Sequence, residues 1–91
     1  MAVFNYSPEI RKELSEEFSK RKIDFRFLND EKVEASCPGN VFHRLVLAAR
    51  CNYLTDYTGL LHVTRYQFTH YPKRIHAKRK KMGRHGLIII D

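Results

Sequence analysis

The side chains best suited to chemistry gather in one basic stretch near the C-terminus. Nine basic residues lie within 13 positions: Lys73, Arg74, His76, Lys78, Arg79, Lys80, Lys81, Arg84 and His85. No acidic residue occurs between Asp56 and Asp91. Like charges at this density repel one another unless anions neutralise them, and nucleic-acid phosphates are common anions of suitable spacing. The stretch therefore predicts a phosphate-binding segment, with a solvated basic loop that has no fixed partner as the alternative.

Aromatic residues lie directly before this stretch and alternate with cations. Arg65, Tyr66, Phe68 and Tyr71 fall within seven positions. Exposed rings at the end of a strand can stack on splayed bases, and RNA or single strands are expected ahead of duplex. Arg65, Tyr66 and Tyr71 are accordingly predicted to join the binding site. Tyr66 and Phe68 are predicted with somewhat greater weight to be core residues, because aromatic residues at alternate strand positions usually face the interior.

Other chemistries have less support in the sequence. Cys37 and Cys51 lack the close Cys-x2-Cys pairing of zinc sites, so neither a metal nor another cofactor is predicted. His43 lies two turns from Arg50 on the exposed side of an expected helix, and a histidine with such basic neighbours could serve RNA cleavage as general acid or base. No paired carboxylates or paired histidines accompany them, and a nuclease is therefore the less favoured interpretation against a protein that is not an enzyme.

The charge of the chain is uneven. The 91 residues carry 17 Lys and Arg against 10 Asp and Glu, a net charge of +7. Residues 1–40 hold 7 basic and 8 acidic residues, whereas residues 41–91 hold 10 and 2. Such asymmetry indicates one working face, whose partner is a nucleic acid or the acidic surface of a protein. The second partner would make the chain a small interaction module, such as an inhibitor or adaptor, because steering toward an acidic protein uses the same field.

Membranes and export are not expected. The basic stretch has no accompanying apolar face that could insert into a bilayer, and no signal peptide or apolar run of membrane-spanning length is visible. A cytoplasmic protein with reduced thiols is the expectation. The oligomeric state stays open.

Periodicity and turn residues predict the elements that must hold the site. Ser7 and Pro8 open a helix with Ile10, Leu14 and Phe18 on one side. A β-hairpin is expected from residues 23–28 and 33–37, and a second helix is expected to begin after an N-cap at Asn40. Residues 55–59 read as a loop, residues 60–71 as a long strand, residues 72–86 as a basic loop and residues 87–90 as an inner strand.

The expected order is therefore α-β-β-α-β-β. An α+β fold in a single domain, residues 1–91, follows from it, with a four-stranded, mostly antiparallel sheet covered on one face by two helices. The strand order is not readable from the sequence.

Overall fold

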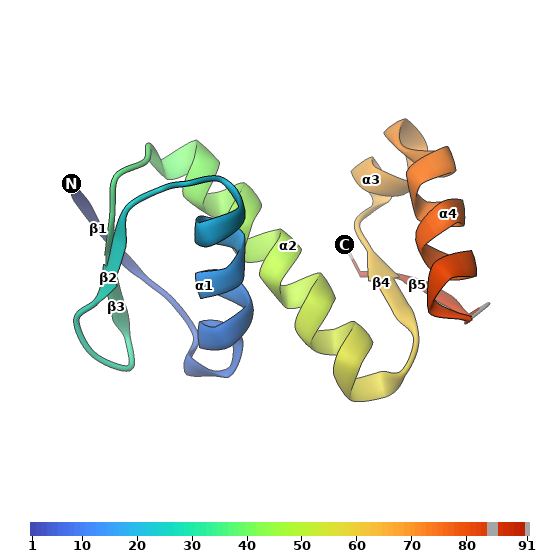
Figure 1. Cartoon of the computed structure of the whole chain (residues 1–91), viewed down its shortest axis with the longest axis horizontal. Coiled ribbons are helices and arrows are strands. Elements are labelled where there is room, and N and C mark those ends of the chain that lie inside the picture. The colour runs from blue at the N-terminus through green and yellow to red at the C-terminus, as the bar shows by residue number, and fades with distance from the viewer. Residues whose placement is uncertain (84–85, 91) are drawn as a thin grey trace. The chain divides into compact units, whose positions relative to one another are not determined.

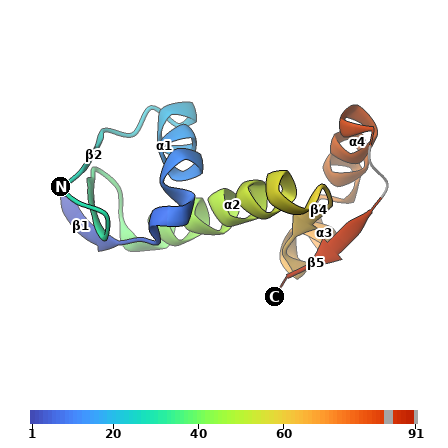
Figure 2. The same cartoon turned by 90° about the horizontal axis from the view of Figure 1, so that it is seen from below.

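The computed structural model describes residues 1–83 and 86–90, and it is an α+β protein (Figure 1). Its internal contacts divide the chain into two units, Met1–Arg50 and Cys51–Asp91. The α2 helix, Gly39–Thr58, runs through the boundary between them as one continuous helix (Figure 2).

The first unit contains a three-stranded antiparallel sheet. Its strands are β1 (Ala2–Asn5), β2 (Phe25–Phe27) and β3 (Lys32–Ala35), in the order β1-β3-β2. Val33 pairs with Phe4 on one side and with Phe27 on the other. The hairpin expected from the alternation of residues 23–28 and 33–37 is confirmed, and β1 is a strand that the sequence analysis did not predict.

One face of this sheet packs against helices, and the other meets solvent. Along β3 the side chains of Val33 and Ala35 are buried, while Lys32 is exposed. The two kinds alternate because successive strand residues point to opposite faces. On the buried face the rings of Phe18 and Phe25 stack with centroids 5.0 Å apart.

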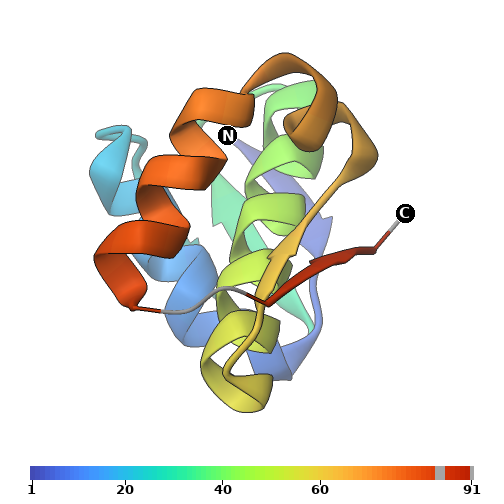
Figure 3. The same cartoon turned by 90° about the vertical axis from the view of Figure 1, so that its right-hand side faces the viewer.

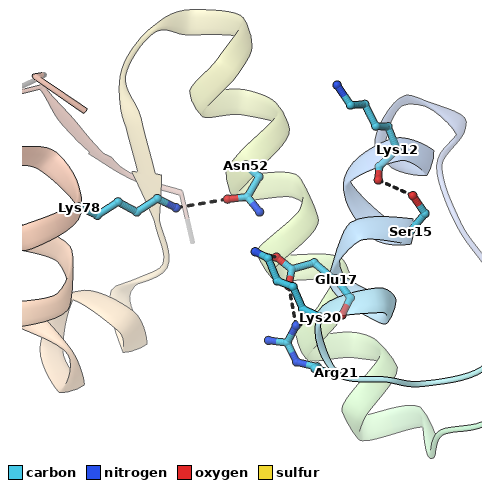
Figure 4. A network of polar contacts seen from close by, with 7 residues as sticks. All are labelled: Lys12, Ser15, Glu17, Lys20, Arg21, Asn52 and Lys78. Atoms are coloured by element: carbon cyan, nitrogen blue, oxygen red, sulfur yellow. Dashed lines mark hydrogen bonds and ion pairs between the residues drawn. The ribbon is translucent and has the colours of Figure 1, made fainter. Parts of the chain in front are cut away.

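The first helical segment begins as a 3-10 turn, η1 (Pro8–Ile10), and continues as α1 (Arg11–Lys20). Ser7 occupies the predicted N-cap position, but its side chain forms no capping hydrogen bond. Leu14 and Phe18 are fully buried, as the helical spacing predicts. Glu17 is also buried, and Arg21 donates to its carboxylate at 2.5 Å while Lys20 lies 3.6 Å away, so the carboxylate keeps its charge partners (Figure 4).

The second unit packs two short strands and two helices around a small core. The elements are β4 (Leu61–Val63), α3 (Arg65–His70), α4 (Pro72–Met82) and β5 (Leu87–Ile89). The strands β4 and β5 pair in parallel, and Figure 3 shows them side by side with α4 at one side of them. Leu61, Val63 and Ile75 form the core, and Met82 and Leu87 pack against it.

The predicted four-stranded sheet is wrong, because the strands form a three-stranded sheet and a separate parallel pair. The connection from β4 to β5 contains two helices, and such a crossover returns the chain in the same direction. The second helix also differs from the prediction, since it begins one residue before Asn40 and includes residues 55–58, which were expected in a loop.

The predicted long strand over residues 60–71 and the basic loop over residues 72–86 are likewise wrong. Only residues 61–63 are a strand, and the capping box of Thr64 and Gln67 then starts α3. Pro72 begins α4, where its missing N–H costs no hydrogen bond. In the described part of the chain, no helix is long and apolar enough to cross a membrane.

Candidate nucleic-acid interface

The basic segment is folded as the helix α4. Pro72 lies in its first turn, and Gly83 ends it in the left-handed conformation at φ 67°, which glycine adopts without steric cost. Its last turn carries Arg79, Lys80 and Lys81. Cations at this end of a helix interact favourably with the helix dipole, so the sequence of charges supports the helix as well as a binding role.

A single apolar side of α4 faces the core, and the cations occupy the remaining circumference. Ile75 is buried, and Met82, two turns later, is half-buried against the same cluster. Six of the predicted basic residues are exposed: Lys73, Arg74, His76, Lys78, Lys80 and Lys81. Arg79 is half-buried. The helical period therefore spreads the predicted contacts over a broad basic surface of α4.

Lys78 differs from the other lysines of α4, because its ammonium has a hydrogen-bond partner. Its Nζ donates to Oδ1 of Asn52 on α2 at 3.3 Å, an interaction drawn in Figure 4. Lys73, Lys80 and Lys81 are exposed, and among the described side-chain contacts they have no such partner, so they are the cations best placed to meet a phosphate. The charge around them is one-sided, since the sequence places no carboxylate on α3 or α4.

Exposed rings and a cation lie together where α3 passes into α4. We call this group the aromatic corner, and it consists of Tyr66, His70, Tyr71 and Arg74. The rings of Tyr66 and His70 lie 4.2 Å apart, and those of Tyr66 and Tyr71 lie edge to face at 6.1 Å. The guanidinium of Arg74 lies over the ring of Tyr71 at 5.2 Å. Ring faces and a planar cation are thus available at one place on the surface.

A capping box sets the position of α3. The Thr64 hydroxyl accepts from the backbone N–H of Gln67 at 3.1 Å, and the Gln67 side-chain oxygen accepts from the Thr64 N–H at 2.9 Å. The thiol of Cys51 on α2 also approaches that oxygen, with 3.9 Å between Sγ and Oε1. These contacts fix the start of a helix of only six residues, and through it the rings of the aromatic corner.

The structure places most of the predicted site residues on α3 and α4 of the second unit. Tyr66 is 60% exposed and Phe68 is 44% exposed, so the expectation that they belong to the core is wrong. Arg65 is exposed in the first turn of α3, and Tyr71 joins the two helices. Arg84, also predicted as a contact, and His85 lie outside the described residues.

Two contributors to this surface were missed by the sequence analysis. The His70 ring lies tilted against that of Tyr66, and the four-residue spacing of the two would have suggested the contact if the segment had been recognised as a helix. Asn52 holds Lys78, and no local pattern indicates this, because the two residues are 26 positions apart.

Within residues 1–83 and 86–90, no three His, Cys, Asp or Glu side chains gather as a metal site would require. His43 and Arg50 are exposed on α2, as expected for that side of the helix. Cys37 and Cys51 are thiols rather than disulfide partners.

Comparison with known proteins gives no assignment, since no family model, curated protein or solved structure matches this chain.

Proposed function

We propose that this protein binds nucleic acid, with α4 contacting the phosphate backbone and the aromatic corner contacting bases. The observation that carries the proposal is the exposure of Lys73, Lys80 and Lys81 on a helix whose segment contains no acidic residue. Each lysine offers a mobile point charge, and each phosphate contact releases condensed counterions, which is the main source of affinity in such complexes.

The aromatic corner favours RNA or another single strand over duplex. Tyr66 is the most exposed of its tyrosines, and it lies beside Tyr71, over which Arg74 stacks. Unpaired bases can insert beside such rings, and each stacked base contributes about 1–3 kcal/mol. Paired bases inside a duplex are already stacked on their neighbours and gain little from these rings. Arg65, in the first turn of α3, would add a further backbone contact.

A pair of matched variants tests the proposal. In the first, Lys73, Lys80 and Lys81 of α4 are changed to Gln. In the second, the same net charge is removed from the first unit by changing Lys12, Lys22 and Lys32 to Gln, all of which are exposed. Binding is measured by fluorescence anisotropy with a labelled single-stranded RNA and with a duplex of the same sequence, at low salt and at physiological salt.

The α4 variant is expected to lose at least tenfold in affinity at physiological salt, because three phosphate contacts disappear, while the control variant stays within about twofold. The RNA strand is expected to bind more tightly than the duplex. Equal losses in both variants would mean that net charge alone drives binding and would contradict a site on α4. If no nucleic acid binds and the purified protein instead retains one acidic protein partner, the chain is an interaction module rather than a nucleic-acid-binding protein.

A further inference from the structure

The strand β5 is an open edge. Its sheet contains only β4 and β5, so among the described residues no strand lies on the other side of β5. Leu61 N–H donates to the Gly86 carbonyl at 3.1 Å, and Ile90 N–H donates to the Val63 carbonyl at 3.0 Å. In a parallel ladder alternate residues bond to the same neighbour, so the backbone groups of Leu87 and Ile89 point away from β4.

The opposite edge of the same sheet is closed. The N–H of His62, which points away from β5, donates to the hydroxyl of Thr55 on α2 at 3.1 Å. Thr55 is buried, and its hydroxyl in turn donates to the Cys51 carbonyl at 2.6 Å. An additional strand can therefore join this sheet only at β5.

The side chains of β5 resemble those of an inner strand. Residues 87–90 are apolar without interruption, a pattern typical of strands with neighbours on both sides. Even so, Ile88 is 38% exposed and Ile89 is 42% exposed. The edge strand β2 of the first unit differs, because its middle residue Arg26 is exposed and pairs with Glu34 at 3.1 Å. Natural edges carry such charges to prevent pairing, and β5 carries none.

The positive charge of the unit that contains β5 favours an acidic partner. The unit Cys51–Asp91 contains eight Lys and Arg and two Asp. The α4 helix packs against the core of this strand pair through Ile75 and Met82, and the turn that contains Met82 also carries the exposed Lys80 and Lys81. A second copy would add an equal excess of positive charge, whereas an acidic segment would reduce the repulsion.

We propose that the open edge of β5 binds an extended, acidic segment of a partner protein as an additional strand. Leu87 and Ile89 provide the backbone hydrogen bonds, Ile88 and Ile89 provide apolar contact, and the cations of α4 interact with the acidic side chains. Addition of a strand to an exposed edge is a recurrent way of recognising peptides. This site uses β5 rather than the aromatic corner, and it shares Lys80 and Lys81 of α4 with the proposed nucleic-acid interface.

Two synthetic peptides of about six residues test this site, one alternating Val with Glu and the other alternating Val with Lys. Amide hydrogen exchange of the full chain is followed by NMR with and without each peptide. The Glu peptide is expected to slow exchange of the Leu87 and Ile89 amides at least tenfold, because these N–H groups become hydrogen-bonded, and the Lys peptide is expected to have no effect. Equal effects of both peptides, or none, would overturn the proposal.

Two further measurements keep the outcome clear. A Glu peptide whose backbone is N-methylated at alternate residues cannot form the ladder and should lose the effect, with the protein itself unchanged. Ile89→Pro removes a donor that faces away from β4, so it should abolish peptide binding and leave the circular dichroism intact. If Leu87 and Ile89 are already protected without peptide, to an extent that rises with protein concentration, a second copy occupies the edge and the proposal is wrong.

Discussion

Removal of the Thr64 hydroxyl is the sharpest test of how the aromatic corner is positioned. Thr64→Ala eliminates the acceptor that holds the Gln67 N–H at 3.1 Å. Replacing a threonine N-cap by alanine costs about 1 kcal/mol, and Thr64 is buried, so water replaces the lost acceptor poorly. We therefore expect a loss of about 1–2 kcal/mol in the free energy of unfolding, with the larger value if the Gln67 N–H stays unbonded.

The structural consequence should be concentrated in α3. This helix has six residues, too few to be stable without its cap and its packing. The two bonds of the capping box share both residues, so Gln67→Ala should remove much of the same stabilisation. The double variant should then lose less than the sum of the single losses. Thr64→Ser keeps the hydroxyl and is the matched control.

Urea unfolding gives the free energies, and amide exchange at Gln67 reports the local opening. The free energy of unfolding of Thr64→Ser should lie within about 0.5 kcal/mol of that of the unchanged protein, because only a methyl group is lost. If Thr64→Ala and Thr64→Ser are equally stable, or if the single losses add fully in the double variant, the capping box does not hold α3 and the reasoning fails.

Three other outcomes are expected. Ile75→Ala should cost about 2–5 kcal/mol, because it removes a central side chain of the small second core, and urea unfolding should show it; a loss below 1 kcal/mol would mean that α4 is not held there. Replacing Tyr66 and Tyr71 by Ala should weaken binding of single-stranded RNA by about 1–3 kcal/mol per stacked base, whereas Phe at both positions should restore it; equal losses for Ala and Phe would exclude stacking. Burial raises the pKa of the Cys37 thiol, so its reactive thiolate forms at higher pH than in the unfolded chain. Alkylation of Cys37 should therefore be slower in the folded protein than in the unfolded chain near pH 8, and equal rates would contradict the shift.

The sequence predicted the first unit better than the second, for a physical reason. The helical spacing of Leu14 and Phe18 and the alternation around Phe25 and Phe27 are local patterns, and each corresponds to an element in the structure. Strand β1 was missed because its pairing with β3 is a contact between distant parts of the chain.

The elements of the second unit were predicted wrongly because local propensities compete there. Residues 65–71 are rich in aromatic residues, which favour strands, yet the capping box of Thr64 and Gln67 and the proline at position 72 favour helices and prevail. The Thr-x-x-Gln spacing was readable in the sequence. The parallel pairing of β4 and β5 was not, since it depends on how two intervening helices pack.

The candidate site was likewise predicted only in part from the sequence. The cations were located by composition alone, but their exposed arrangement around Ile75 follows from a helix that the sequence analysis took for a loop. The exposure of Tyr66 likewise depends on α3, because a strand at these positions would have turned its ring toward the core.

The salt dependence of RNA binding tests the central claim most directly, because it counts the phosphate contacts that α4 makes. The logarithm of the binding constant is measured against the logarithm of the salt concentration for the unchanged chain and for the variant with Lys73, Lys80 and Lys81 changed to Gln. Each lost contact with a single strand should reduce the magnitude of the slope by about 0.7, so a difference of about 2 is expected. An unchanged slope would show that these lysines do not contact phosphate and would contradict the account.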